Sequence, residues 1–273
     1  MRRSLTAAVV QLCSRQEVTE NLRRCEALVA QAAARGAELV VLPENFAYIG
    51  QLSTKLKLAE PLDAERPGPI LGAMRALAQR EKVHLLLGGT PTSTDDPARF
   101  RNTAILLSPE GKLLAAYHKL HLFDVNIPDG AVFRESEHVA PGEELATTEV
   151  LGATLGLSIC YDLRFPELYR ELVRRGATVV CVPAAFTLHT GKDHWLPLLR
   201  ARAIENQVYV LAAGQYGRHT ESRASYGKSC IIDPWGAVVA QASDAEGIAV
   251  AELDLDYLAK VRRELPCLGH RRL

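Results

Sequence analysis

Uninterrupted apolar runs constrain the fold of this chain more than any other feature of its sequence. Residues 39–42 and 179–182 contain no polar side chain, and residues 153–159 also have the pattern of a buried strand. A strand with one face in water alternates apolar and polar residues, so an unbroken run indicates a strand covered on both faces. Elsewhere in the chain, apolar residues recur at helical spacing, as in residues 22–32 and 70–82. The combination predicts an α/β fold.

The sequence predicts a single domain. Its 273 residues are 48% apolar, which is enough for a sizeable core, and no linker or low-complexity tract divides them. Residues 108–111 (SPEG) and 233–236 (DPWG) are typical of turns between strands. Residues 123–144 have no clear period and are predicted to form a long ordered loop, whereas residues 193–206 are predicted to be helical.

Charge and cysteine usage limit the expected partners and compartment. The chain has 32 basic and 32 acidic residues. Nucleic acids and anionic membranes attract clustered excess Lys and Arg, so neither is expected as a partner. No apolar run approaches membrane-spanning length, and the N-terminal residues lack the pattern of a signal peptide. The six cysteines are dispersed without a C-x-x-C pair, which favours a reducing, cytoplasmic compartment over a disulfide framework or zinc site.

Three predicted strands end in side chains whose chemistry is complementary. One strand leads to Glu44, another to Lys119, and a third to Cys160. Alone, each has a structural interpretation: a solvated carboxylate, a surface lysine, or a cysteine packed as a small hydrophobe. Ligands of open α/β sheets bind beyond the carboxyl ends of strands, however. A carboxylate, an ammonium and a thiol brought together there would supply a base, an electrophile and a nucleophile.

The local sequence around Cys160 suits a reactive thiol. Cys160 follows a strand, and Pro166 opens an amphipathic segment that is typical of a helix. Free backbone N–H groups between a strand and a helix favour a thiolate and a developing oxyanion. His118 and His121 lie near Lys119, but no third ligand completes a metal pattern, so a structural role is favoured for both.

Segments around these residues resemble the signature segments of the nitrilase, or carbon–nitrogen hydrolase, superfamily. They are residues 42–45 (LPEN), 118–124 (HKLHLFD) and 159–167 (ICYDLRFPE), and the similarity in order and spacing extends over essentially the whole chain. The resemblance implies a four-layer α-β-β-α sandwich with two mixed β-sheets, in one carbon–nitrogen hydrolase domain spanning residues 1–273. It also implies a homodimer or dimer-based oligomer, and neither a metal nor an organic cofactor.

The same resemblance implies roles for individual residues. Glu44 would be the general base, and Cys160 the nucleophile that forms a thioester later hydrolysed by water. Lys119 and the backbone N–H of Tyr161 would stabilise the oxyanion. The second glutamate of the family matches Glu135 in the segment 133–136 (FRES). Three nearby glutamates compete for that assignment: Glu137, Glu143 and Glu144.

Further motifs resemble the deaminated glutathione amidase branch of the superfamily. These are residues 217–219 (GRH), 223–227 (RASYG), 233–236 (DPWG), 265–266 (LP) and 270–272 (HRR), while 183–186 (PAAF), 190–191 (TG) and 194–195 (HW) are shared with the sister ω-amidase branch. The resemblance implies a cysteine-dependent amidohydrolase that cleaves a side-chain amide of an α-keto acid, deaminated glutathione above all. Alternatives are an ω-amidase acting on α-ketoglutaramate or α-ketosuccinamate, an N-carbamoyl amide hydrolase, and a non-catalytic binding module on the same scaffold.

Such a substrate is a small anionic amide, and several residues are candidates to bind it. Arg164 is placed to meet a carboxylate, although a salt bridge with Glu167 or Asp162 would also explain it. Arg218 and His219 are predicted to lie on a loop that reaches distal carboxylates. The opposite wall is assigned to Phe186, Thr187, Thr190 and Trp195, of which the two aromatic residues would equally suit the core.

Overall fold

A computed structural model describes residues 3–63, 65–126 and 132–272, and contains two mixed six-stranded sheets. The first has the order β16 (Gly247–Asp254), β1 (Ser4–Gln11), β2 (Leu39–Val41), β3 (His84–Ser93), β4 (Phe100–Leu107), β5 (Leu113–His118). The second has the order β15 (Val238–Gln241), β14 (Cys230–Ile232), β11 (Tyr209–Ala212), β10 (Val179–Cys181), β9 (Ala153–Leu157), β8 (Thr147–Val150). Strands β1, β2 and β3 are parallel, as are β9, β10 and β11, and the other neighbours are antiparallel.

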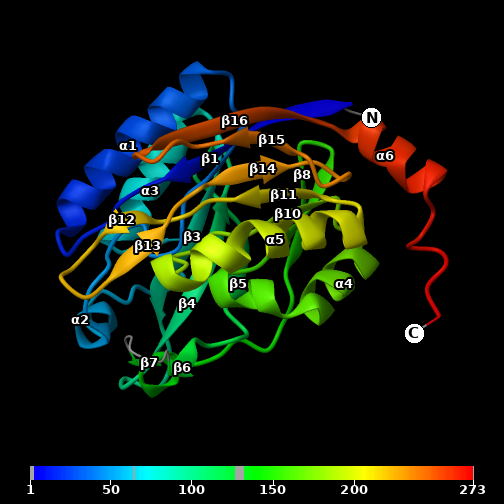
Figure 1. The fold of residues 1–273 in the computed structure, drawn as a ribbon. Coiled ribbons are helices and arrows are strands. Elements are labelled where there is room, and N and C mark those ends of the chain that lie inside the picture. The colour runs from blue at the N-terminus through cyan, green and yellow to red at the C-terminus, as the bar shows by residue number, and fades with distance from the viewer. Residues whose placement is uncertain (1–2, 64, 127–131, 273) are drawn as a thin grey trace.

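Helices cover the outer faces of both sheets. Helices α1 (Val18–Ala34) and α3 (Pro69–Glu81) pack on the first sheet, and α4 (Pro166–Arg174) and α5 (Leu188–Asn206) pack on the second (Figure 1). The predicted four-layer α-β-β-α sandwich is therefore confirmed. Two further helices are α2 (Leu52–Lys57) and α6 (Leu255–Glu264).

The alternation of side chains along each strand divides the interior into two cores. On β1, Ala7 and Val9 face the second sheet, whereas Ala8 and Val10 face α1 and α3. All four side chains are fully buried. Strands covered on both faces have no solvent side, which explains the unbroken apolar runs of the sequence.

One sequence prediction about local structure was incomplete and another was wrong. The helix predicted over 193–206 begins earlier, at Leu188, because the Thr187 hydroxyl accepts the N–H of Thr190 and caps it. Residues 123–144 are not a continuous loop: β6 (Asp124–Asn126) pairs with β7 (Val132–Arg134), and the short helix η1 (Glu135–Glu137) follows. Residues 127–131 of that segment lie outside the described residues. A remaining hairpin joins β12 (Tyr216–Arg218) to β13 (Ala224–Tyr226).

The carboxyl ends of the parallel strands of both sheets meet at one place. A Cβ atom added to Gly88, on β3, would lie 2.0 Å from the Leu42 carbonyl oxygen and 2.4 Å from Pro183 Cβ. Leu42 follows β2 of the first sheet, and Pro183 follows β10 of the second. Glycine at position 88 thus permits the two sheets to approach closely where the candidate residues are located.

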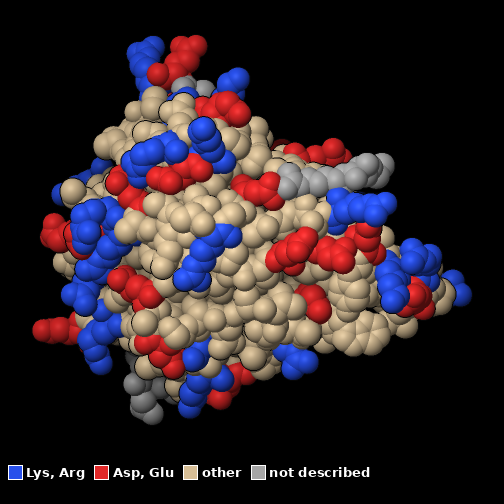
Figure 2. Space-filling view, turned by 90° about the horizontal axis from the view of Figure 1, so that it is seen from above, with Lys and Arg blue, Asp and Glu red and all other residues tan. Residues whose placement is uncertain are grey.

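No helix in the described ranges is both long enough and apolar enough to cross a membrane. On the face shown in Figure 2, basic and acidic side chains are interspersed. This distribution agrees with the equal numbers of basic and acidic residues in the sequence.

Candidate active site

Cys160 lies in a strained turn after β9, at the start of the short helix η2 (Cys160–Arg164). Its φ angle is +50°, a left-handed conformation that is costly for a residue with a side chain. The N–H of Cys160 donates to the Pro183 carbonyl over 2.8 Å, whereas the N–H of Tyr161 has no acceptor within the described part of the chain. The turn therefore combines a thiol with a backbone donor that remains available to a ligand.

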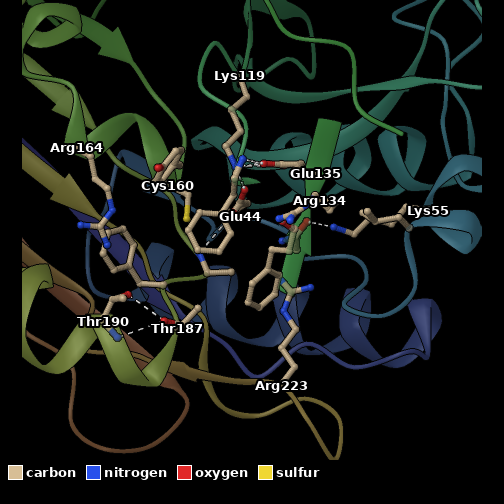
Figure 3. Close-up of a pocket in the computed structure, with 17 residues that line it drawn as sticks. Glu44, Lys55, Lys119, Arg134, Glu135, Cys160, Arg164, Thr187, Thr190 and Arg223 are labelled. Carbon is tan, nitrogen blue, oxygen red and sulfur yellow. Dashed lines mark hydrogen bonds and ion pairs between the residues drawn. The ribbon is translucent and has the colours of Figure 1, made fainter. Parts of the chain in front are cut away.

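Beside the thiol, Lys119 joins two carboxylates in a buried ion-pair cluster (Figure 3). Its Nζ lies 2.9 Å from Glu44 Oε1 and 2.9 Å from Glu135 Oε2. The Lys119 side chain is 2% exposed and that of Glu44 5%. Burying charges costs several kcal/mol per ion unless they are paired and hydrogen-bonded. We call Glu44, Lys119 and Glu135 the charged floor.

Further donors satisfy every carboxylate oxygen of the charged floor. Asn102 Nδ2 donates to Glu44 Oε1 over 2.9 Å and to Glu135 Oε1 over 3.3 Å. The backbone N–H of Ala185 donates to Glu44 Oε2 over 3.1 Å, and that of Phe123 to Glu135 Oε2 over 2.7 Å. Because no oxygen lacks a donor, the three charged side chains are held in one arrangement.

Burial opposes charge on these groups, and the ion pairs determine which of them stay charged. Burial would lower the pKa of Lys119, but Glu135 and Glu44 outweigh it and hold that pKa well above its ordinary value. Burial would raise the pKa of Glu44, but Lys119 reverses the effect and lowers it. Burial, with the charge of Glu44, raises the pKa of the Cys160 thiol well above its ordinary value. In the free site the proton therefore stays on sulfur.

Asp162 connects the cysteine turn to the segment that carries Lys119. Its Oδ2 accepts the Ile159 N–H and the Tyr117 hydroxyl, each over 2.8 Å. Its Oδ1 accepts the His121 backbone N–H over 3.1 Å and lies 2.7 Å from His121 Nδ1. Since Tyr117 and His121 flank Lys119 in sequence, one fully buried carboxylate fixes two segments of the site relative to each other.

Outward from the charged floor, cationic side chains line the same pocket. Lys55 comes from α2, Arg164 from η2, and Arg223 from the residue before β13. None of the three forms an ion pair with a carboxylate of the described residues. We call Lys55, Arg164 and Arg223 the cationic mouth. Four aromatic side chains also line the pocket: Phe123, Phe133, Tyr161 and Phe186.

Comparison with known proteins identifies the family. A sequence model described as carbon-nitrogen hydrolase matches residues 6–263. The chain belongs to the carbon–nitrogen hydrolase family. It is 48% identical over 269 residues to a protein of Synechocystis named deaminated glutathione amidase, covering 97% of both chains. It is 43% identical to the human protein of that name, covering 97% of this chain and 81% of that one.

Solved structures agree with this assignment. The crystal structure of Saccharomyces cerevisiae Nit3, described as a member of branch 10 of the nitrilase superfamily, superposes with a TM-score of 0.90 at 33% identity. The alignment covers 99% of this chain and 97% of Nit3. The resemblance inferred from the sequence motifs is therefore confirmed, and this carbon–nitrogen hydrolase is an enzyme that acts on C–N bonds.

The fold of this carbon–nitrogen hydrolase brings most of the predicted site residues into one pocket. Arg164 has neither of the salt bridges considered for it: its guanidinium lies over the rings of Tyr161 and Phe186 and meets His194 Nδ1 at 3.3 Å. The other predicted residues that line the pocket are Glu44, Lys119, Glu135, Cys160, Tyr161, Phe186, Thr187 and Thr190. The competing glutamates, Glu137, Glu143 and Glu144, are exposed.

Three predicted substrate-binding residues are not among those that line this pocket. Trp195 is buried beneath Phe186 and donates its Nε1–H to the Lys228 carbonyl over 2.9 Å. His219 is buried too, with its ring nitrogens 2.8 Å from the Ser14 carbonyl and 2.9 Å from the Ser225 hydroxyl. Arg218, the last residue of β12 rather than part of a loop, donates to the Glu221 carbonyl.

Sequence reasoning assigned no role to several residues of this site, among them Asn102, Lys55, Arg134 and Arg223. Asn102 gave no signal of its own, because the polar residues Arg101 and Thr103 stand on either side of it in β4. Arg223 belongs to the motif 223–227, but no role was assigned to it. Lys55 has the sequence context of an ordinary surface lysine and gave no signal.

The two histidines near Lys119 have structural partners. His118 Nδ1 lies 2.8 Å from the Thr103 hydroxyl, and His121 stacks on Phe165 with ring centroids 3.6 Å apart. Within the described residues, no three His, Cys, Asp or Glu side chains are grouped so that they could hold a metal ion.

Proposed function

We propose that this carbon–nitrogen hydrolase cleaves the amide of an α-keto acid through a thioester on Cys160, with deaminated glutathione as its substrate. The observation that carries the proposal is the cationic mouth beside a cysteine, a lysine and two glutamates. Deaminated glutathione has a carboxylate at each end and two amide bonds between them, and the proposed reaction cleaves the one that joins the α-keto acyl group to cysteinylglycine. Cations without a carboxylate partner suit such a dianion. The names of the Synechocystis and human relatives support the same substrate.

Acylation begins when Cys160 Sγ attacks the amide carbonyl and its proton passes to Glu44. The oxyanion that forms is stabilised by Lys119 and by the N–H of Tyr161, and one such donor typically contributes about 100- to 1000-fold in rate. When Lys119 meets the oxyanion, its effect on Glu44 weakens and the pKa of Glu44 rises. The carboxylate thus becomes a stronger base at the moment when the thiol loses its proton.

The tetrahedral intermediate then collapses. Glu44 returns the proton to the nitrogen, the C–N bond breaks, and cysteinylglycine leaves while the α-keto acyl group stays on sulfur. A water molecule attacks the thioester, Glu44 takes its proton and delivers it to sulfur, and α-ketoglutarate is released. Glu135, held by Lys119 and Asn102, orients Lys119 for both steps.

The second candidate is ω-amidase activity on α-ketoglutaramate or α-ketosuccinamate, in which ammonia is the leaving group. Arg164, close to the nucleophile in sequence, suits the α-keto acid end that both substrate types share. The two remaining cations of the mouth, Lys55 and Arg223, favour the longer substrate because a short amide has no second carboxylate for them.

The test compares wild-type enzyme with Cys160→Ala on both substrates. We expect α-ketoglutarate from deaminated glutathione with a kcat/KM at least tenfold above that for α-ketoglutaramate, and none from the variant. A preference for α-ketoglutaramate would assign the enzyme to the ω-amidase type. If neither substrate gave a product while Cys160 still reacted with an alkylating reagent, the substrate assignment would be refuted.

We also propose that the chain forms a homodimer in the cytoplasm. Ile204 near the end of α5, Trp235 in the β14–β15 turn and Leu265 just after α6 are 48%, 61% and 51% exposed. Large exposed apolar side chains of this kind suit a protein interface. Sedimentation at micromolar concentration should give twice the monomer mass, and Trp235→Asp should shift the measured mass toward that of the monomer.

The absence of C-x-x-C pairs supports a reducing compartment.

A further inference from the structure

Lys55 is a buried cation that forms no ion pair with any carboxylate of the described residues, although Glu44 and Glu135 act on it from a distance. Its residue is 6% exposed, and its Nζ contacts the side-chain oxygen of Asn45, a neutral acceptor. Burial first, and then the positive charge of Arg223, lower the pKa of Lys55 to about 8. A buried ammonium is favourable only when a negative charge or several hydrogen bonds compensate for its lost hydration. In the free enzyme, the neutral oxygen of Asn45 compensates for only part of the hydration that Lys55 has lost.

Arg223 repeats this pattern on the same side of the pocket. Its guanidinium lies 5.9 Å from the centroid of the Phe133 ring, and no carboxylate of the described residues pairs with it. Figure 3 shows Lys55 and Arg223 on one side of Cys160 and Arg164 on the other. Two like charges that face one pocket repel each other until an anion is bound between them.

We propose that Lys55 and Arg223 form a second carboxylate-binding site, which holds the terminal carboxylate of the leaving amine, while Arg164 holds the carboxylate of the α-keto acid. The inference rests on the proposed function and adds to it the residues that select the leaving group. Lys55 and Arg223 are then determinants of specificity, since they touch a part of the substrate that does not react.

The position of Lys55 indicates which end of the substrate it meets. Its partner Asn45 directly follows Glu44, the group that protonates the departing nitrogen. Arg164 instead belongs to the same short helix as Cys160, which keeps the acyl group. The leaving amine therefore extends toward Lys55 and Arg223, and the acyl chain toward Arg164.

The experiment uses two matched substrates that differ only in the distal carboxylate. One is deaminated glutathione, and the other is the same compound with its glycine carboxylate converted to a carboxamide. The variants are Arg223→Gln and Lys55→Met. Matched controls are Arg35→Gln and Lys57→Met, which alter exposed residues that do not line the pocket.

Wild-type enzyme should prefer the carboxylate over the carboxamide by at least tenfold in kcat/KM, the usual effect of a charge-assisted hydrogen bond. Arg223→Gln should lower kcat/KM for the carboxylate at least tenfold and leave the carboxamide within twofold. Lys55→Met should act in the same direction, and Arg223→Gln keeps the test valid if Lys55→Met does not fold. Arg164→Gln should lower kcat/KM for both substrates by the same factor.

Two results would overturn this inference and leave the proposed function standing. One is an equal loss of kcat/KM for both substrates in Arg223→Gln, and the other is a wild-type enzyme that does not prefer the carboxylate over the carboxamide. Failure of the wild type to cleave either compound would remove the proposed function and this inference together. The two failures are therefore distinguishable in one set of assays.

Discussion

The charged floor and the cationic mouth treat charge in opposite ways. In the floor, Lys119 lies 2.9 Å from each of two carboxylates, and every carboxylate oxygen has a donor. In the mouth, Lys55, Arg164 and Arg223 have no carboxylate partner among the described residues. The charges of the floor are therefore paired before a ligand binds, whereas the cations of the mouth gain their carboxylate partners from the ligand.

This difference separates two tasks within one pocket. Groups that act on the reacting atoms work best when they are already fixed, because no reorganisation is then needed during the reaction. Groups that select a substrate work best when the substrate supplies the missing charge. Changes in the floor should therefore affect the rate of the chemical step, and changes in the mouth should affect binding.

The largest effect is expected from Lys119→Met, which removes the one cation of the floor. Turnover should fall by at least 1000-fold, since an oxyanion donor is lost together with the charge that holds two carboxylates. The free energy of unfolding at pH 7 should fall by about 3–5 kcal/mol, because both carboxylates stay buried without a counter-charge. Urea unfolding measures this, with Lys57→Met as the exposed control.

The pH dependence of that loss has a definite sign. In the wild type the pKa of Glu44 is lowered, so its contribution to stability is lost as pH falls below the unfolded value of about 4.3. In Lys119→Met, burial of Glu44 is no longer offset by the lysine, so the pKa of Glu44 is raised and the variant gains stability on acidification. The stability difference between the two proteins should shrink from pH 7 to pH 4, and a constant difference would contradict the account.

A smaller effect is expected from Asp162→Asn, which weakens the link between the cysteine turn and the lysine segment. The amide can accept at only one of the two positions that receive Tyr117, Ile159 and His121. We expect kcat to fall about tenfold with KM within twofold, because Asp162 positions groups and does not touch the substrate. A loss of stability with unchanged kcat in the folded enzyme would show a purely structural role. Asp193→Asn, on the exposed surface of α5, is the control.

The smallest effect is expected from salt. Arg164 and Arg223 are only partly buried and so are more accessible to ions than the floor. Raising the salt concentration from 0.05 to about 0.5 M should therefore increase KM for deaminated glutathione a few-fold. The value of kcat should change little, since the floor is buried. A fall in kcat at constant KM would place the salt-sensitive charges in the floor instead.

The parts of the site that were predictable from sequence are those that follow from strand ends. Glu44 and Cys160 each follow a buried strand after two intervening residues, and Lys119 directly follows β5, so the apolar pattern indicated where they lie. Glu135 was assigned only through the family resemblance, because nothing local distinguishes it from Glu137. Its 2.9 Å contact with Lys119 is a long-range feature that emerges only when the chain folds.

Residues whose environment depends on tertiary packing could not be predicted. Lys55 lies on a short helix and is buried because α2 packs against β3, which its flanking sequence does not reveal. Trp195 and His219 were expected at the substrate but lie in the interior. The Lys228 carbonyl accepts a hydrogen bond from Trp195, and the Ser14 carbonyl contacts a ring nitrogen of His219. An aromatic or histidine side chain in a motif suits either location, and only the packing distinguishes them.

The most direct test of the division between floor and mouth is the rate of Cys160 acylation in single turnovers. It is measured by rapid quench and mass spectrometry as a function of deaminated glutathione concentration. Glu44→Gln should lower the saturating rate by at least 100-fold and leave the half-saturating concentration within threefold, whereas Arg223→Gln should raise that concentration at least tenfold and leave the saturating rate within twofold. If both variants changed the same parameter, the floor and the mouth would not be separate devices and the account would be wrong.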